Sequence, residues 1–131
     1  MKRPWSAPAA AALLTVASAC DSKPEPVRGF DPGPVPAELA DGERGYDGNC
    51  RPCHGPLGTG TQAGPPLVHR IYEPSHHADA AFQLAVTRGV RAHHWAFGNM
   101  PPLPAMDSAG IAAVTTYVRW LQRQAGITDA R

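Results

Sequence analysis

Apolar residues recur at helical spacing most clearly in the last third of the chain. Over residues 107–124 they follow intervals of three and four, the pattern of one face of an α-helix. This apolar face consists of Ile111, Val114, Val118 and Leu121, flanked by Tyr117 and Trp120. Asp107 is a suitable N-cap, and Gly126 suits the position just after the helix end. We therefore predict a long amphipathic helix here.

A second, shorter helix is predicted over residues 79–88. Asp79 can serve as its N-cap and Gly89 as its stop. Its apolar surface consists of Phe82, Leu84, Ala85 and Val86. This helix is separated from the others by segments rich in Gly and Pro, which favour loops.

A third helix is predicted over residues 37–50, with Gly42 and Tyr46 on one face. Glycine lowers helix stability by roughly 1 kcal/mol relative to alanine, so Gly42 indicates a close approach by another element. The chain has no run of β-branched and aromatic residues of the kind that forms a sheet. The predicted fold class is therefore all-α.

The most informative motif is Cys50-Arg51-Pro52-Cys53-His54, the pattern of c-type haem attachment. Two thiols at this spacing can each form a thioether with a haem vinyl group, and His54 then becomes the proximal iron ligand. A zinc site would need a second ligand pair, which the one remaining cysteine cannot supply. A thioredoxin-like redox pair would follow a strand, not a helix. One covalently bound haem c is the favoured cofactor.

A haem would also explain how so small a domain folds. Short helices and long loops in about 90 residues bury little apolar surface on their own. A covalently held macrocycle gives the loops an apolar surface to pack against. We expect three to four short helices and long loops wrapped around the haem.

The first 19 residues have the pattern of a secretory signal peptide. Lys2 and Arg3 form a charged start, residues 8–19 are a short apolar run, and small residues precede Cys20. Residues 16–20 resemble a bacterial lipobox, in which the cysteine is lipidated; the alternative is ordinary cleavage that leaves a free thiol. No later stretch approaches the roughly 18 consecutive apolar residues of a membrane span. We expect an exported, periplasmic protein held at the membrane surface by lipid at Cys20.

Residues 20–36 are predicted to form a Pro-rich tether before a domain at 37–131. Prolines and charges alternate there, and an extended chain at about 3.1 Å per residue would reach on the order of 50 Å. A plain disordered N-terminus is the alternative. The chain has 12 Lys and Arg and 11 Asp and Glu. Two of these basic residues lie in the predicted signal peptide, so the mature protein is near neutral, and no basic stripe points to nucleic acid.

From residue 37 to 127 the sequence resembles a single-haem class I cytochrome c. Gly42 and Tyr46 stand where that family places the glycine and aromatic residue of its first helix. Val114 and Tyr117 stand where the last helix of the family packs across them. The resemblance implies the class I cytochrome c fold, with one covalently bound haem.

Two further loops carry the resemblance and imply ligand roles. Gly64-Pro65-Pro66-Leu67 resembles the Gly-Pro-x-Leu loop of the family, which implies that the carbonyl of Pro65 accepts the second ring N–H of His54. Gly98-Asn99-Met100-Pro101-Pro102 resembles the loop that delivers the distal methionine. A thioether is a soft neutral ligand, and His/Met ligation raises the potential of a haem. Met106 is the rival to Met100 but lacks the Met-Pro pair, and a histidine is the third candidate for the distal ligand. Met100 could instead merely pack.

The resemblance implies an electron carrier and not an enzyme. Its haem would cycle between Fe(III) and Fe(II). The protein is expected to be a monomer that exchanges electrons with donor and acceptor redox proteins, membrane-bound respiratory complexes among them. One alternative is a haem enzyme or gas sensor with a displaceable sixth ligand. Another is copper or other metal handling at the pairs His76-His77 and His93-His94. Adjacent histidines on an extended chain point to opposite sides, so hydrogen-bonded loop residues are the expectation for both pairs.

Overall fold

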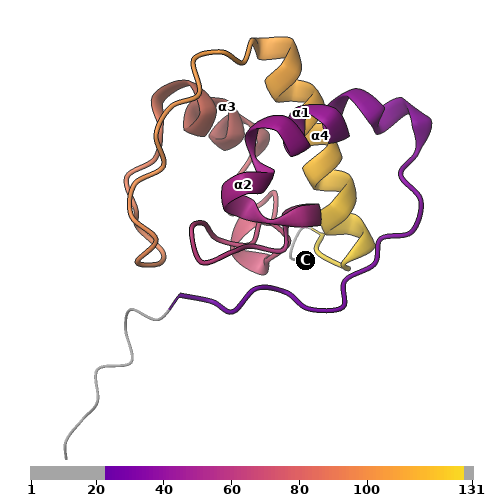
Figure 1. Ribbon diagram of the computed structural model, residues 1–131, viewed down its shortest axis with the longest axis horizontal. Helices are drawn as coiled ribbons and strands as arrows, with labels where there is room; N and C mark the ends of the chain where they lie inside the picture. The colour runs from indigo at the N-terminus through magenta and orange to yellow at the C-terminus, as the bar shows by residue number, and fades with distance from the viewer. Residues whose placement is uncertain (1–22, 129–131) are drawn as a thin grey trace, which may run out of the picture.

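The structure, a computed structural model, describes residues 23–128. Its α-helices in that range are α1 (Ala40–Asn49), α2 (Arg51–His54), α3 (Asp79–Arg88) and α4 (Ser108–Gln124) (Figure 1). The 3-10 turn η1 (Ala37–Leu39) precedes α1, and the turns η2 (Pro56–Gly58) and η3 (Arg70–Tyr72) lie between α2 and α3. The described residues form no strand, only an isolated bridge between Val90 and Met100. The predicted all-α class is confirmed.

The three predicted helices are present, with small differences at their ends. The predicted helix 37–50 is divided into η1 and α1, and Cys50 then joins α1 to α2. The helix α3 covers the predicted residues and ends at Arg88, followed by Gly89, whose φ is 75°. Loops of irregular structure make up most of the remaining chain, as the Gly and Pro content indicates.

Both predicted ends of α4 are confirmed. The carboxylate of Asp107, the N-cap, accepts a hydrogen bond of 2.7 Å from the backbone N–H of Gly110. At the other end, the N–H of Ile127 donates to the carbonyl of Gln122 at 2.8 Å, with Gly126 at a φ of 72° between them. This is the six-to-one hydrogen bond of the Schellman motif, which satisfies a carbonyl that the helix itself cannot.

The predicted N-cap of α3 is wrong. Ala78 occupies the N-cap position, and Asp79 is the first helical residue. The carboxylate of Asp79 instead accepts a hydrogen bond of 2.8 Å from Nε of Arg119 on α4. A hydrogen bond from a guanidinium is stronger than one from a backbone N–H. The acid still lies in the first turn, where the helix dipole favours a negative charge.

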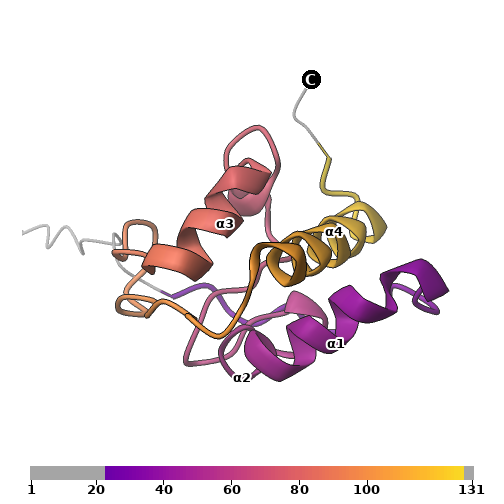
Figure 2. The ribbon, with the colours of Figure 1, turned by 90° about the horizontal axis from the view of Figure 1, so that it is seen from above.

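The helix α4 lies between α1 and α3 and contacts both (Figure 2). Its contact with α1 is the closer one because Gly42 has no side chain. A Cβ on Gly42 would lie 2.9 Å from the Cβ of Tyr117 and closer still to the carbonyl oxygen of Ala113. Only hydrogen fits at this position, so the close approach expected at Gly42 is the contact between the two helix backbones.

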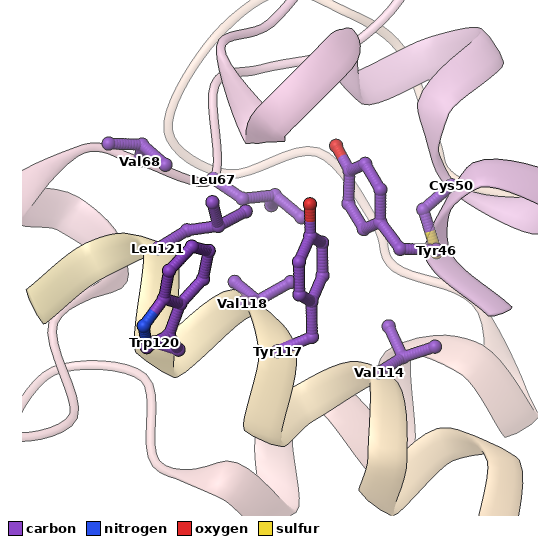
Figure 3. Packing of buried hydrophobic residues seen from close by; sticks show 9 residues of the cluster. All are labelled: Tyr46, Cys50, Leu67, Val68, Val114, Tyr117, Val118, Trp120 and Leu121. Carbon is purple, nitrogen blue, oxygen red and sulfur yellow. The ribbon is translucent and has the colours of Figure 1, made fainter. Parts of the chain in front are cut away.

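An aromatic pair forms the centre of the core between α1 and α4. The ring centroids of Tyr46 and Tyr117 are 5.6 Å apart, and both side chains are almost fully buried. The hydroxyl of Tyr46 donates to the carbonyl of Gly55 at 2.8 Å, which satisfies its one buried polar group. The rest of the cluster, shown in Figure 3, consists of Cys50, Leu67, Val68, Val114, Val118, Trp120 and Leu121. The core therefore reaches directly to the attachment motif through Cys50.

Residues 23–36 contain no helix, as expected, but they do not stand free of the domain. They run along its surface, in indigo in Figure 1, and the N–H of Val27 donates to the carbonyl of Thr59 at 2.8 Å. Phe30 and Val35 pack against the core cluster. These apolar side chains, spaced between the prolines, give the segment something to bury.

The predicted signal peptide (1–19) and Cys20 lie outside the described residues. Among the helices of residues 23–128, none has the length and apolar character needed to cross a bilayer.

Changing Gly42 to alanine should lower the stability of the haem-bound protein by about 1–3 kcal/mol, the usual cost of overpacking. The added methyl group would force α1 away from Tyr117 and Ala113. Guanidinium unfolding followed by circular dichroism measures the change. Gly48→Ala is the matched control, because a Cβ at Gly48 in the same helix meets nothing within 4 Å. That variant should gain up to about 1 kcal/mol from helix propensity; equal effects of both variants would contradict the close contact.

Candidate functional site

The attachment motif lies where α1 passes into α2. Cys50 is buried and belongs to the core, whereas Cys53 is exposed. The backbone N–H of His54 donates to the carbonyl of Cys50 at 2.8 Å, so one helical turn holds both sulfurs and the imidazole. Burial, followed by the neighbouring Cys53, raises the pKa of Cys50 to about 11. The proline of the motif, Pro52, stands in the first turn of α2, where its missing N–H costs nothing.

The imidazole of His54 is held in one orientation by a backbone carbonyl. Its Nδ1 lies 2.9 Å from the carbonyl oxygen of Pro65, the contact that the family resemblance implies. A carbonyl oxygen only accepts, so Nδ1 carries the proton and Nε2 is left to bind a metal ion. Burial lowers the pKa of His54, and the hydrogen bond to Pro65 partly opposes this. A lowered pKa favours the neutral imidazole, which is the form that ligates metals.

The loop that carries Pro65 is fixed by contacts to the attachment motif. The hydroxyl of Thr61 donates to the carbonyl of Cys53 at 2.6 Å. The N–H of Gly60 donates to the carbonyl of His54 at 2.7 Å. A Cβ on Gly64 would lie only 2.8 Å from the carbonyl oxygen of Cys53, so the loop passes directly over α2. The motif and the loop that orients its histidine therefore form one rigid unit.

Met100 is held at the base of the loop that follows α3. It forms an isolated antiparallel bridge with Val90, and the two hydrogen bonds of this bridge are each 2.9 Å long. Within the loop, the side chain of Asn99 accepts a hydrogen bond of 3.0 Å from the N–H of Ala92. Met106 has a different environment, because it packs against the core cluster near the start of α4.

One large cavity is lined by every residue that the sequence predicts to attach, ligate or orient the haem. Its volume is about 580 Å³, within the usual range for sites that bind small molecules and cofactors. Among the described residues that line it are Cys50, Cys53, His54, Pro65 and Met100, and Met106 is not one of them. The remaining walls are mostly apolar side chains from α3, α4 and the loop after α3, and His77, His93 and His94 also line the cavity. An apolar cavity with two thiols, an imidazole and a thioether on its walls fits a covalently held haem.

Sequence reasoning missed a polar network on α4 that holds one wall of the site. The buried guanidinium of Arg119 donates to the carboxylate of Asp79, to the carbonyl of Tyr72 at 2.7 Å, and to the carbonyl of His77. Gln122, also buried, donates to the carbonyls of Leu67 and Tyr72 at 2.9 and 3.0 Å. The available signal was a charged residue set directly between Val118 and Trp120 in the apolar stretch of this helix.

The two histidine pairs lie close together, which the sequence does not reveal. The ring centroids of His76 and His94 are 5.3 Å apart, and those of His77 and His93 are 5.9 Å apart. The expected hydrogen bonds to loop carbonyls are present for His77 and His93. Burial is the main cause that lowers the pKa values of His77 and His94, and the neighbouring imidazoles lower both further.

Comparison with known proteins assigns the family. The Cytochrome c family model matches residues 39–122, from the start of α1 almost to the end of α4. The chain therefore belongs to the cytochrome c family, with the class I fold and one covalently bound haem c. Searches of curated proteins and of solved structures gave no match. At the level of the family, the role is haem-based electron transfer with redox partner proteins.

Replacing Arg119 with methionine should cost on the order of 2 kcal/mol of folding stability in the haem-bound protein. The change removes hydrogen bonds from a charged donor, and the carbonyl of His77 and the carboxylate of Asp79 lose this partner. Guanidinium unfolding measures the loss. Arg123→Met is the control, since Arg123 lies exposed on the same helix and should change stability by less than about 0.5 kcal/mol. Equal free energies of unfolding for the two variants would contradict a stabilising role of the Arg119 hydrogen bonds.

Proposed function

We propose that this protein is a periplasmic electron carrier whose haem iron is ligated by His54 and Met100. In this proposal Cys50 and Cys53 attach the haem through thioether bonds, and Pro65 orients His54. The haem supplies the one-electron chemistry by cycling between Fe(III) and Fe(II). Its donor and acceptor are other redox proteins, and the protein works as a monomer.

The observation that carries this proposal is the shared cavity. Both thiols and His54 come from the attachment motif, Met100 comes from the loop after α3, and all four line the same apolar space of about 580 Å³. Met106, the rival distal ligand, packs elsewhere, against the core. This supports Met100, and not Met106, as the distal ligand.

The residues around the cavity suit electron transfer because each ligand is held before any electron arrives. The Nδ1 proton of His54 is bound to the carbonyl of Pro65, so Nε2 would be free to ligate iron in either oxidation state. The bridge to Val90 holds the backbone of Met100, and the prolines that follow Met100 restrict its loop. Two protein ligands leave no open position for a substrate, which argues for a carrier and against an enzyme.

The apolar walls of the cavity should favour the reduced form. Ferric haem carries one more positive charge than ferrous haem, and a medium of low dielectric penalises that charge. A neutral thioether ligand acts in the same direction. Both effects raise the midpoint potential of the haem, so the protein should accept electrons from a donor of lower potential.

Replacing Met100 with alanine should lower the midpoint potential on the order of 0.2 V, within the roughly 0.8 V over which axial ligands tune haems. The ferric iron would lose its soft neutral donor and bind water instead. A redox titration measures the potential. The long-wavelength charge-transfer band of methionine-ligated ferric haem should disappear from the spectrum, and added imidazole should bind readily.

Met106→Ala is the matched control for this test. It removes a partly buried side chain that packs on the core, so it should cost at most about 2 kcal/mol of stability and leave the spectrum and potential unchanged. The reverse pattern, with Met106 controlling the band, would show that the distal ligand is wrongly assigned.

The proposal extends to a lipid anchor at Cys20. Small residues precede this cysteine, and its thiol would otherwise be exposed in an oxidising compartment. Lys23, three residues later, donates to the carbonyl of Gln62 at 3.1 Å and lies 4.9 Å from the ring centroid of Phe97. Three extended residues span roughly 10 Å. A lipid at Cys20 would therefore keep the Phe97 side of the haem cavity close to the membrane surface.

Replacing Cys20 with serine should move the protein from the membrane fraction to the soluble periplasmic fraction. Haem attachment should be unaffected, because Cys20 is not part of the cavity motif. Fractionation followed by haem staining measures the distribution, and the intact mass of the wild type should include acyl and glyceryl groups. A wild type that is wholly soluble and unmodified at residue 20 would remove the anchor from the proposal.

A further inference from the structure

Three histidines form a cluster with the geometry of a metal site, and two of them, His77 and His94, line the haem cavity. His76 and His77 belong to the turn that precedes α3, and His94 belongs to the loop that follows it. One ring nitrogen from each lies within 4.8 Å of one from each of the others. The ring of His93 lies alongside, with its centroid 4.3 Å from that of His94. Nitrogens this close can share one ion after small rotations of their side chains, because a zinc–nitrogen bond is about 2.0–2.1 Å long.

The hydrogen bonds within the cluster orient the rings as metal ligands are oriented. Nδ1 of His77 lies 2.6 Å from the carbonyl oxygen of Ile71, so it donates its proton there. Nε2 of His77 is then the unprotonated nitrogen, available to a metal. Metal-binding histidines usually donate their second ring N–H to a carbonyl or carboxylate in this way, which fixes both tautomer and ring orientation.

An unsatisfied nitrogen points to a missing partner in the same cluster. Nε2 of His94 is buried and has no hydrogen-bond partner among the described residues. A buried polar atom without a partner normally costs on the order of 1–3 kcal/mol. An ion held by the three histidines through this atom would satisfy it.

The turn that carries two of the ligands is held rigidly by the body of the protein. Arg119 on α4 donates to the backbone carbonyls of Tyr72 and His77, on either side of His76. It also binds Asp79, at the start of α3. The loop of His94 is closed at its base by the bridge between Val90 and Met100. A site built from two anchored segments loses little conformational entropy when an ion binds.

We propose that His76, His77 and His94 bind one divalent transition-metal ion of the Cu²⁺ or Zn²⁺ kind, separate from the haem iron. Imidazole nitrogens suit these ions, whereas Ca²⁺ and Mg²⁺ need oxygen ligands that this cluster does not supply. Three protein ligands leave a fourth position for water or for His93. Of the two ions, Cu²⁺ should bind more tightly, following the general order of affinities for such sites.

The test is a Zn²⁺ titration of the haem-bound protein, purified without a histidine tag and treated with a chelator. Isothermal titration calorimetry should show one ion per chain. His76→Ala and His94→Ala should each weaken binding at least about tenfold. His76 is exposed, so its variant should fold normally, and an unchanged visible spectrum checks this. Cu²⁺ bound to the wild type should show nitrogen hyperfine coupling in its electron paramagnetic resonance spectrum.

His69→Ala is the matched control. Its ring packs against Trp95 and is not part of the cluster, so Zn²⁺ binding should be unchanged. The haem spectrum should also stay constant during the titration, which separates this site from the iron and from the ligation by His54 and Met100. Absence of saturable binding, as expected if haem propionates occupy the histidines, would overturn the proposal. Binding equal in wild type and both cluster variants would do the same, because the ion would then lie elsewhere.

Discussion

The contact between α1 and α4 is the constraint on which the rest of the structure depends. At Gly42 the two helix backbones touch, and the rings of Tyr46 and Tyr117 fill the space beside them. The attachment motif continues directly from α1, so this contact also places Cys50 against the core. The hydroxyl of Tyr46 then binds the carbonyl of Gly55, just after the motif. One helix pair thus determines where a haem can be attached and which wall of the cavity it meets.

Features encoded by local pattern could be predicted from the sequence. The apolar face of 107–124, its Asp107 cap and its Gly126 end are set by residues close together in the chain, and the structure contains all three. The attachment motif is equally local, and the family match agrees with the resemblance that its residues carry. The contact between His54 and Pro65 could be anticipated only from that resemblance, because the partners lie eleven residues apart on either side of a loop. The ligand role of Met100 is likewise an expectation that only the proposed experiments test.

Features that depend on competition between partners could not be predicted. Asp79 is a good N-cap by its type and position, yet the guanidinium of Arg119, 40 residues away, binds its carboxylate instead. Residues 20–36 are rich in proline, which indicates a free spacer, but Phe30 and Val35 find apolar surface on the domain. In both cases the deciding partner is distant in sequence, so the local pattern contains no information about it.

The helix α4 makes two kinds of contact with the rest of the protein. One side is apolar and packs on α1, where burial of Tyr117 and Val118 stabilises the fold. Another side carries Arg119 and Gln122, whose hydrogen bonds hold the carbonyls of the segment between Leu67 and His77. Leu67 and Val68 anchor the start of that segment in the core, and the polar contacts with defined geometry hold the part that follows. Hydrogen bonds from these side chains to backbone carbonyls can hold imidazoles beside an apolar cavity, because they fix the backbone that carries the rings. They do not use the ring nitrogens, which can then bind an ion.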